Sequence, residues 1–211
     1  VSSAKAAGMW QFMPATGKYF ELKQNAFRDD RRDVLESTRA ALDYLQKLYG
    51  MFGDWELALA AYNWGEGSVS RALARNKAAG LGLSYSELNM PAETRYYVPK
   101  LQAVKNIIAS PDGFRAKLPD IGNHPYFDTV TITRDIDVAL AAQLAEVPLD
   151  DFKALNPSMN RPVIMAAVSS MPSGRSWASR MLSAGKFRIV ASSLMVPLSE
   201  STARACICRW T

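Results

Sequence analysis

The sequence predicts a mainly α-helical protein followed by a small unit of mixed helices and strands. Apolar residues recur at three- and four-residue spacing in several segments between 36 and 108, which is the period of helices with one buried face. Between 126 and 133, apolar residues come to alternate with threonine, which is the period of a strand. A length of 211 residues allows one domain with a full core and a second, smaller one.

Four helices are predicted in the larger part. They cover 36–49, 55–62, 69–79 and 93–108. Gly50 and Gly53 end the first helix, Asp54 is a good N-cap for the second, and Gly80 ends the third. On the fourth helix one face is shared by Tyr97, Leu101, Val104 and Ile108. We expect this domain to occupy 1–115.

A linker is expected at 116–125, after Pro111 and Gly113 and around Pro119. The smaller unit, 126–166, is predicted to contain a strand at 126–133, short helices at 137–145 and 149–155, and a returning strand that begins at 163–165. About forty residues form a core that is marginal by itself.

Residues 167–211 have a different composition. They contain 6 Lys and Arg, 1 acidic residue and 10 serines, so they carry the whole net charge of +5, whereas 1–166 contain 19 basic and 19 acidic residues. The balanced body excludes a polyanion such as nucleic acid as an expected partner. Cys206 and Cys208 are too close for an ordinary disulfide and too few for a zinc site. We expect this tail to be disordered or translated out of frame, which reading the coding DNA in its other two frames would test.

Targeting and cofactor signals are absent from the sequence. No run of about 18 apolar residues and no signal peptide is present, and the first residue is Val1 rather than Met. No metal-ligand pattern occurs, so we expect no metal and no cofactor. His124, the single histidine, is expected in a solvent-exposed loop, and the charged run Arg28–Asp33 in a solvated loop with local ion pairs.

Three motifs in order carry a family resemblance. They are Gly-Met-Trp-Gln-Phe-Met-Pro at 8–14, Ala-Tyr-Asn-x-Gly at 61–65 and Glu-Thr-Arg-Tyr-Tyr-Val at 93–98. Residues 1–115 thereby resemble the lytic murein transglycosylases with a lysozyme-like fold, and most of all the membrane-bound lytic transglycosylase D group. Residues 126–165, with Leu-Asn-Pro at 155–157, are similar to a LysM-like segment.

The resemblance implies an enzyme that acts on the glycan strands of peptidoglycan, as a monomer, without a cofactor. It implies non-hydrolytic cleavage of the MurNAc–GlcNAc β-1,4 bond. One glutamic acid protonates the leaving oxygen and then acts as base toward the C6 hydroxyl, which gives a 1,6-anhydro end. It also implies a cell-envelope location in the periplasm, with membrane contact only through an anchor upstream of Val1.

Substrate contacts are expected at positions that match the motifs. These residues are Gln11, Phe12, Tyr62, Asn63 and Tyr97. Amides in apolar stretches need partners, and sugar hydroxyl and N-acetyl groups can supply them. The alternatives are that each amide ties down its own turn and that the tyrosines are core aromatics. Among the apolar residues of the first motif, Phe12 is the best candidate for a groove wall.

No residue of this sequence inherits the catalytic role. The family's glutamic acid lies some fifteen residues before the motif glycine, a position that falls before Val1. We therefore expect that the front portion of the domain is missing from this chain and that the chain is inactive on peptidoglycan. Glu93 is expected to cap its helix, Glu66 to hold the turn after Asn63, and Glu21 to lie in a polar loop. A non-catalytic peptidoglycan-binding module and a lysozyme-type hydrolase remain alternatives.

Overall fold

The computed structural model describes residues 5–122, 127–166 and 193–197. The chain divides into two compact units, of which the first combines Val1–Ser37 with Asn123–Thr211 and the second is Thr38–Gly122. The border after Gly122 lies inside the predicted linker. The border at Ser37, within a helix, was not predicted from the sequence.

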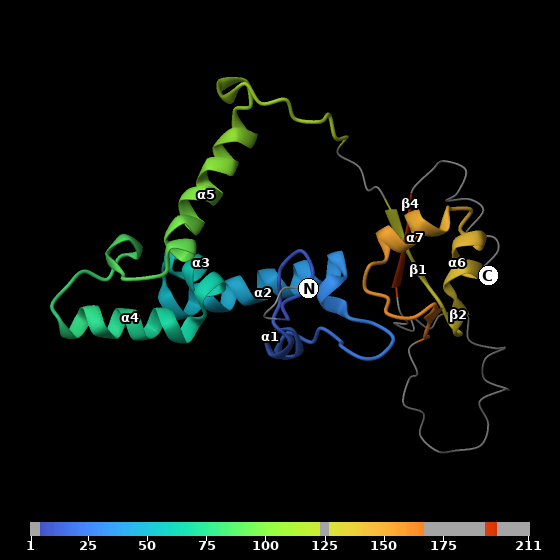
Figure 1. The fold of residues 1–211 in the computed structure, drawn as a ribbon, viewed down its shortest axis with the longest axis horizontal. Helices are drawn as coiled ribbons and strands as arrows, with labels where there is room; N and C mark the ends of the chain where they lie inside the picture. Colours follow the sequence, from blue (N-terminus) through green and yellow to red (C-terminus); the bar gives the residue numbers. More distant parts are fainter. Residues whose placement is uncertain (1–4, 123–126, 167–192, 198–211) are drawn as a thin grey trace, which may run out of the picture. The chain divides into compact units, whose positions relative to one another are not determined.

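The described residues are mainly helical, as predicted (Figure 1). The four predicted helices are α2 (Val34–Phe52), α3 (Trp55–Trp64), α4 (Glu66–Ala78) and α5 (Ala92–Ala109). Gly53 follows α2 with a φ of 67°, a backbone conformation that glycine adopts without strain. The Asp54 side chain accepts the Leu57 N–H at 2.8 Å and begins α3.

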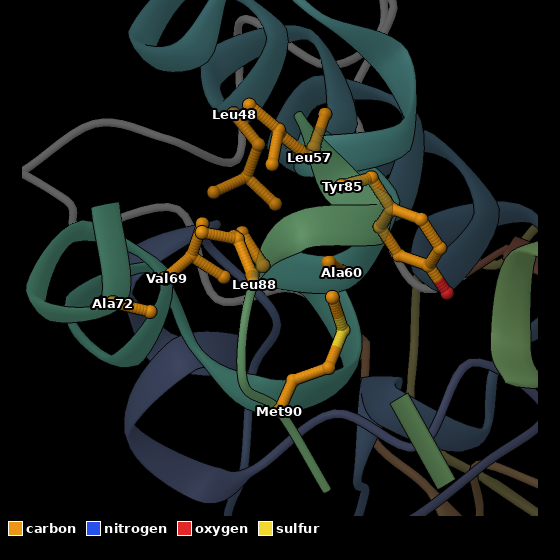
Figure 2. Close-up of a cluster of buried hydrophobic side chains, with 10 residues drawn as sticks. Leu48, Leu57, Ala60, Val69, Ala72, Tyr85, Leu88 and Met90 are labelled. Atoms are coloured by element: carbon orange, nitrogen blue, oxygen red, sulfur yellow. The ribbon is translucent and has the colours of Figure 1, made fainter. Parts of the chain in front are cut away.

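The core of the second unit is formed where α3 contacts α4 and α5 (Figure 1). Figure 2 shows the buried side chains that meet there: Leu48, Leu57, Ala60, Val69, Ala72, Tyr85, Leu88 and Met90. Tyr85 belongs to the short 3-10 helix η2 (Tyr85–Glu87), and its hydroxyl donates to the carbonyls of Thr94 at 2.6 Å and Arg95 at 2.9 Å. This buried phenol therefore holds the first turns of α5 on the core.

Beyond its first turns, α5 is mostly exposed. Thr94 is its one fully buried residue among those described, whereas Leu101, Val104 and Ile108 are about half exposed or more. The apolar residues predicted to share one face of this helix are therefore present, but within the described part of the chain nothing packs over most of that face. A short 3-10 helix, η3 (Asp112–Phe114), follows.

The first part of the first unit contains little regular structure. Residues Ala7 and Phe12 exchange two backbone hydrogen bonds of 3.1 Å, and α1 (Pro14–Tyr19) follows directly. A 3-10 helix, η1 (Asp30–Arg32), precedes α2. None of these three elements was predicted. Each is too short to show a period in the sequence.

The later part of the first unit is a small α+β arrangement, as predicted. β1 (Phe127–Thr131), α6 (Val138–Leu144) and α7 (Leu149–Leu155) confirm the predicted strand and two helices, and Phe152 and Ile132 lie in their core. The returning strand is β3 (Val163–Ile164). It pairs antiparallel with β2 (Ile136–Asp137), and not with β1.

The partner of β1 is β4 (Ser193–Pro197), which pairs with it antiparallel. The expectation that the tail is disordered is therefore wrong for these five residues, whose pairing with β1 depends on a segment about sixty residues away and leaves no local period in the sequence. That the tail is translated out of frame stays a prediction. The rest of that tail, with Cys206 and Cys208, lies outside the described residues, as does His124. None of the described helices is long and apolar enough to cross a membrane.

Candidate functional site

Tyr62 and Asn63 lie in the last turn of α3. Gly65 ends that helix with a φ of 92° and Glu66 begins α4, so the chain turns sharply directly after the two side chains. Tyr62 and Asn63 are each partly exposed. The C-terminal end of α3 therefore exposes part of an aromatic ring and part of an amide, from two consecutive residues.

The Asn63 amide is oriented by α5. Its Oδ1 accepts the Thr94 hydroxyl at 2.8 Å, and its Nδ2 donates to Glu93 Oε1 at 3.3 Å. Thr94 is 2% exposed, so its hydroxyl stays paired with this amide. Asn63 thus connects two helices, which differs from the alternative of an amide that ties down its own turn.

A second group of contacts surrounds Tyr62. Its ring lies 5.4 Å, between centroids, from that of Tyr44 on α2. The Tyr44 hydroxyl donates to Glu66 Oε2 at 3.3 Å, and Lys47 Nζ lies 3.6 Å from Glu66 Oε1. Burial, followed by the charge of Glu66, raises the pKa of Tyr44 to about 12. Burial, followed by the charges of Tyr97 and Tyr44, also raises the pKa of Tyr62. Both phenols are therefore hydrogen-bond donors at neutral pH.

The two carboxylates of this region, Glu66 and Glu93, both contact side chains of other helices. The N-cap of α5 is Pro91, and Glu93 makes no cap hydrogen bond there, so the expectation that it caps the helix is wrong. Its position in the first turn still suits a carboxylate, and its oxygen is used by Asn63. Glu66 contacts Tyr44 and Lys47 on α2, so it joins two helices beyond the turn where it was expected.

Gln11 lies in the first unit, in the turn between Ala7 and Phe12. Its φ is 53°, and both its backbone N–H and its Nε2 donate to the Gly8 carbonyl, at 3.3 and 2.6 Å. One amide hydrogen therefore ties down the turn, as the alternative interpretation expects. The side chain is exposed, and an amide has further donor and acceptor positions for a ligand.

The Arg31 guanidinium stabilises the backbone of this turn. Its Nη1 donates to the carbonyls of Lys5 at 2.8 Å and Phe12 at 3.1 Å, and its Nη2 pairs with Asp29 at 2.7 Å. Burial acts to raise the pKa of Asp29, but the hydrogen bonds and charge of Arg31 outweigh it and the pKa is lowered. Gly8 packs directly against this residue, because a Cβ there would lie 1.7 Å from the Arg31 carbonyl oxygen.

The charged run at 28–33 is thus locally paired, as predicted, but the expectation that it is solvated is wrong. Asp30 is 3% exposed and Arg31 is 7% exposed. The carbonyls of the motif turn need donors in the interior, and an arginine whose charge is balanced by Asp29 supplies them. Burial, opposed by Arg28, raises the pKa of Asp30.

Phe12 is 3% exposed, and its ring lies 6.5 Å from that of Phe20. This burial favours a core side chain over a groove wall for Phe12. The structure groups Tyr62, Asn63 and Tyr97 in the second unit, and Gln11 and Phe12 in the first. Sequence reasoning missed Tyr44 and Thr94. Thr94 follows Glu93 in the third motif, and that position was the available signal.

The described groups favour a neutral, hydroxyl-rich ligand. Phenol hydroxyls, partly exposed aromatic rings and an oriented amide can stack on sugar faces and bind hydroxyl or acetamido groups. Within the described residues no group of three or more His, Cys, Asp or Glu side chains could hold a metal ion.

Comparison with known proteins finds a family match in each part of the chain. Residues 1–81 match the family of transglycosylase SLT domains. Residues 126–171 match the LysM-like domain of lytic transglycosylase MltD. The two matches fall on the predicted larger and smaller parts of the chain.

Among curated proteins, this chain is 40% identical over 156 residues to the membrane-bound lytic murein transglycosylase D of Escherichia coli strain K12. The aligned residues are 74% of this chain and 34% of that protein, so the chain spans about a third of its length. The same values hold for the protein of that name from E. coli O6:H1. A putative tributyltin chloride resistance protein of Alteromonas sp. strain M-1 is 48% identical over 80 residues, which are 36% of this chain and 39% of that protein.

Proposed function

We propose that this chain, a member of the lytic transglycosylase family with a transglycosylase SLT segment and a LysM-like segment, binds the glycan strands of peptidoglycan through Tyr62, Asn63 and Tyr97. The observation that carries the proposal is the Asn63 amide, which Thr94 and Glu93 hold in one orientation beside the partly exposed Tyr62. Gln11, in the first motif, is proposed as a further contact.

The chemistry of the ligand supports this assignment. A glycan strand offers flat sugar faces, hydroxyls and N-acetyl groups and needs no cation or anion site. Tyr62 and Tyr97 supply rings and phenol hydroxyls. Asn63 supplies an amide whose geometry is fixed before the ligand arrives, which reduces the entropy lost on binding.

The reaction that we propose for the family site is non-hydrolytic cleavage of the MurNAc–GlcNAc β-1,4 bond, which leaves a 1,6-anhydro end. Most glycosidases use two carboxylates. One acid suffices here because the attacking hydroxyl belongs to the substrate. In this chain Glu66 is engaged by Tyr44 and Lys47, and Glu93 by Asn63. We therefore propose that neither acts as the acid, and that these 211 residues bind glycan without cleaving it.

Co-sedimentation with purified cell-wall sacculi tests the binding. Wild type is expected to pellet with the sacculi. Asn63→Ala and Tyr62→Ala are expected to pellet about tenfold more weakly, as for loss of one good hydrogen-bonding or stacking group. Tyr96→Ala is the matched control, because Tyr96 is 56% exposed beside Tyr97 on the same helix. Circular dichroism establishes that each variant is folded.

Mass spectrometry of the soluble products tests the absence of cleavage. No new muropeptides are expected. Products with 1,6-anhydro ends would show that the chain is a transglycosylase by itself, and products with reducing ends would favour the lysozyme-type hydrolase. A wild-type chain that stays in the supernatant would contradict glycan binding altogether.

We also propose a monomer in the cell envelope. The location is supported by the name of the E. coli relative, which calls that protein membrane-bound. Analytical ultracentrifugation would contradict the monomer if the chain sedimented as a dimer.

A further inference from the structure

The segment 25–33 connects two parts of the first unit that lie more than 120 residues apart in the sequence. On one side Arg31 supports the turn that carries Gln11. On the other side the segment contacts residues 158–160, which belong to the LysM-like match. These nine residues therefore contact both the turn of Gln11 and the LysM-like segment.

The contacts with 158–160 are specific hydrogen bonds. The Asp29 N–H donates to the Ser158 carbonyl at 2.8 Å, and the Asn160 N–H donates to the Phe27 carbonyl at 2.7 Å. The Asn160 side chain donates to the Asn25 carbonyl at 3.0 Å. Backbone groups paired in this way fix the register of the two segments, as neighbouring strands do.

Arg32 adds contacts from a single nitrogen. Its Nη2 donates to the carbonyls of Ser158 at 3.1 Å and Met159 at 3.4 Å and to Asn160 Oδ1. Its Nε is buried and makes no hydrogen bond in the structure. The contacts of Arg32 with residues 158–160 therefore all come from one cationic nitrogen, Nη2, and a lysine ammonium could replace it.

The contacts with the Gln11 turn and the contacts with residues 158–160 are made by neighbouring residues of η1. Arg31 and Arg32 are consecutive residues of η1, and the position of a Gly8 Cβ would be 1.7 Å from the Arg31 carbonyl oxygen and 3.2 Å from the Arg32 Cα. A turn packed this closely against η1 moves when η1 moves, because the interior leaves no space to absorb the shift.

We propose that residues 25–33 form a joint through which the LysM-like segment holds the turn of Gln11 in its conformation. In this arrangement Arg32 and Asn160 are positioning residues for that turn. The role of the joint in glycan binding rests on the function proposed above, whereas its role in the structure of the turn does not.

Amide hydrogen exchange of the full chain, read residue by residue by NMR, tests the joint without any glycan. In Arg32→Ala, the amides of Asp29 and Asn160 are expected to exchange about tenfold faster, as for loss of a hydrogen bond to a charged group. The amides of Ala7 and Phe12, which pair across the Gln11 turn, are expected to accelerate together with them. Asn160→Ala is expected to give the same pattern.

Two further variants serve as controls. Arg32→Lys is expected to retain nearly wild-type exchange, because the ammonium has three donors for the same acceptors. Arg39→Ala is expected to change none of these amides, because Arg39 is 44% exposed and pairs with Asp43 one turn away.

If Arg32→Ala accelerated amide exchange at Asp29 and Asn160 but not at Ala7 and Phe12, the proposed joint would be overturned. It would also be overturned if this substitution left the exchange of all four amides unchanged. In the glycan arm, Arg32→Ala is expected to weaken sedimentation with sacculi about as much as Gln11→Ala, and undiminished sedimentation would overturn the role of the joint in binding. If wild type does not bind sacculi but the exchange pattern is found, the proposed function fails and the joint stands.

Discussion

Gln11 and Asn63 both present a side-chain amide, but the structure holds the two amides in different ways. Gln11 is placed by backbone: a positive φ, a glycine with no room for a Cβ, and a buried arginine that binds carbonyls. Asn63 is placed by side chains, through Thr94 and Glu93 of a neighbouring helix. The conformation of the Gln11 turn is therefore expected to be disrupted by a single added Cβ at Gly8. The orientation of Asn63 depends on separate side-chain hydrogen bonds, each of which can be removed alone.

The sharpest test of this difference is Gly8→Ala. The new Cβ would overlap the Arg31 carbonyl, and the φ of 79° is unfavourable for alanine, so we expect a loss of about 3 kcal/mol or more in the free energy of unfolding. Urea denaturation followed by circular dichroism measures it. Gly50→Ala is the matched control, because nothing lies within 4 Å of its Cβ position inside α2, and we expect a gain of up to about 1 kcal/mol. Equal effects at both positions would refute the backbone account.

Arg31→Ala is expected to cost about 3 kcal/mol. It removes the guanidinium donor of the Lys5 and Phe12 carbonyls and the guanidinium partner of Asp29. The backbone donors Ala7 N–H to Phe12 and residue 31 N–H to Asp29 remain. Arg39→Ala, at an exposed ion pair, should cost less than about 0.5 kcal/mol. Chemical denaturation of both variants gives the comparison, and a loss at Arg31 no larger than that at Arg39 would count against a supporting role.

Thr94→Val is expected to cost about 1 to 2 kcal/mol and to weaken sedimentation with sacculi. The valine has nearly the same shape but cannot donate to Asn63 Oδ1. Thr94→Ser retains the hydroxyl and should bind sacculi nearly as wild type does. If Val and Ser behaved alike, the orientation of Asn63 would not depend on this hydrogen bond.

Tyr44→Phe should have the smallest effect at neutral pH, below about 1 kcal/mol. The pKa of Tyr44 rises from 10.0 to about 12 on folding, so the phenol stabilises the folded state below pH 10 and this contribution is lost as the pH rises from 10 to about 12. Chemical denaturation across that range should show a shallower fall in stability for the phenylalanine variant. Identical pH profiles would contradict the burial of this hydroxyl.

The sequence predicted the helices and the smaller unit because their apolar residues repeat with a clear period, and Asp54 behaves as the expected cap. It could not predict the burial of Arg31, because its partners are carbonyls at Lys5 and Phe12, and a carbonyl leaves no mark in a sequence. The motifs indicated Tyr62, Asn63 and Tyr97. They did not indicate that Thr94 and Glu93 orient the amide, which depends on how two helices pack.

NMR titration of the folded chain with a soluble peptidoglycan oligosaccharide tests the central claim most directly. The side-chain NH2 resonances of Asn63 and Gln11 report on the two motif amides separately. We predict saturable shifts of both, together with the ring signals of Tyr62 and Tyr97, and no shift of the Asn106 amide at the exposed end of α5. Shifts absent from Asn63, or equal at Asn106, would contradict glycan binding at this site.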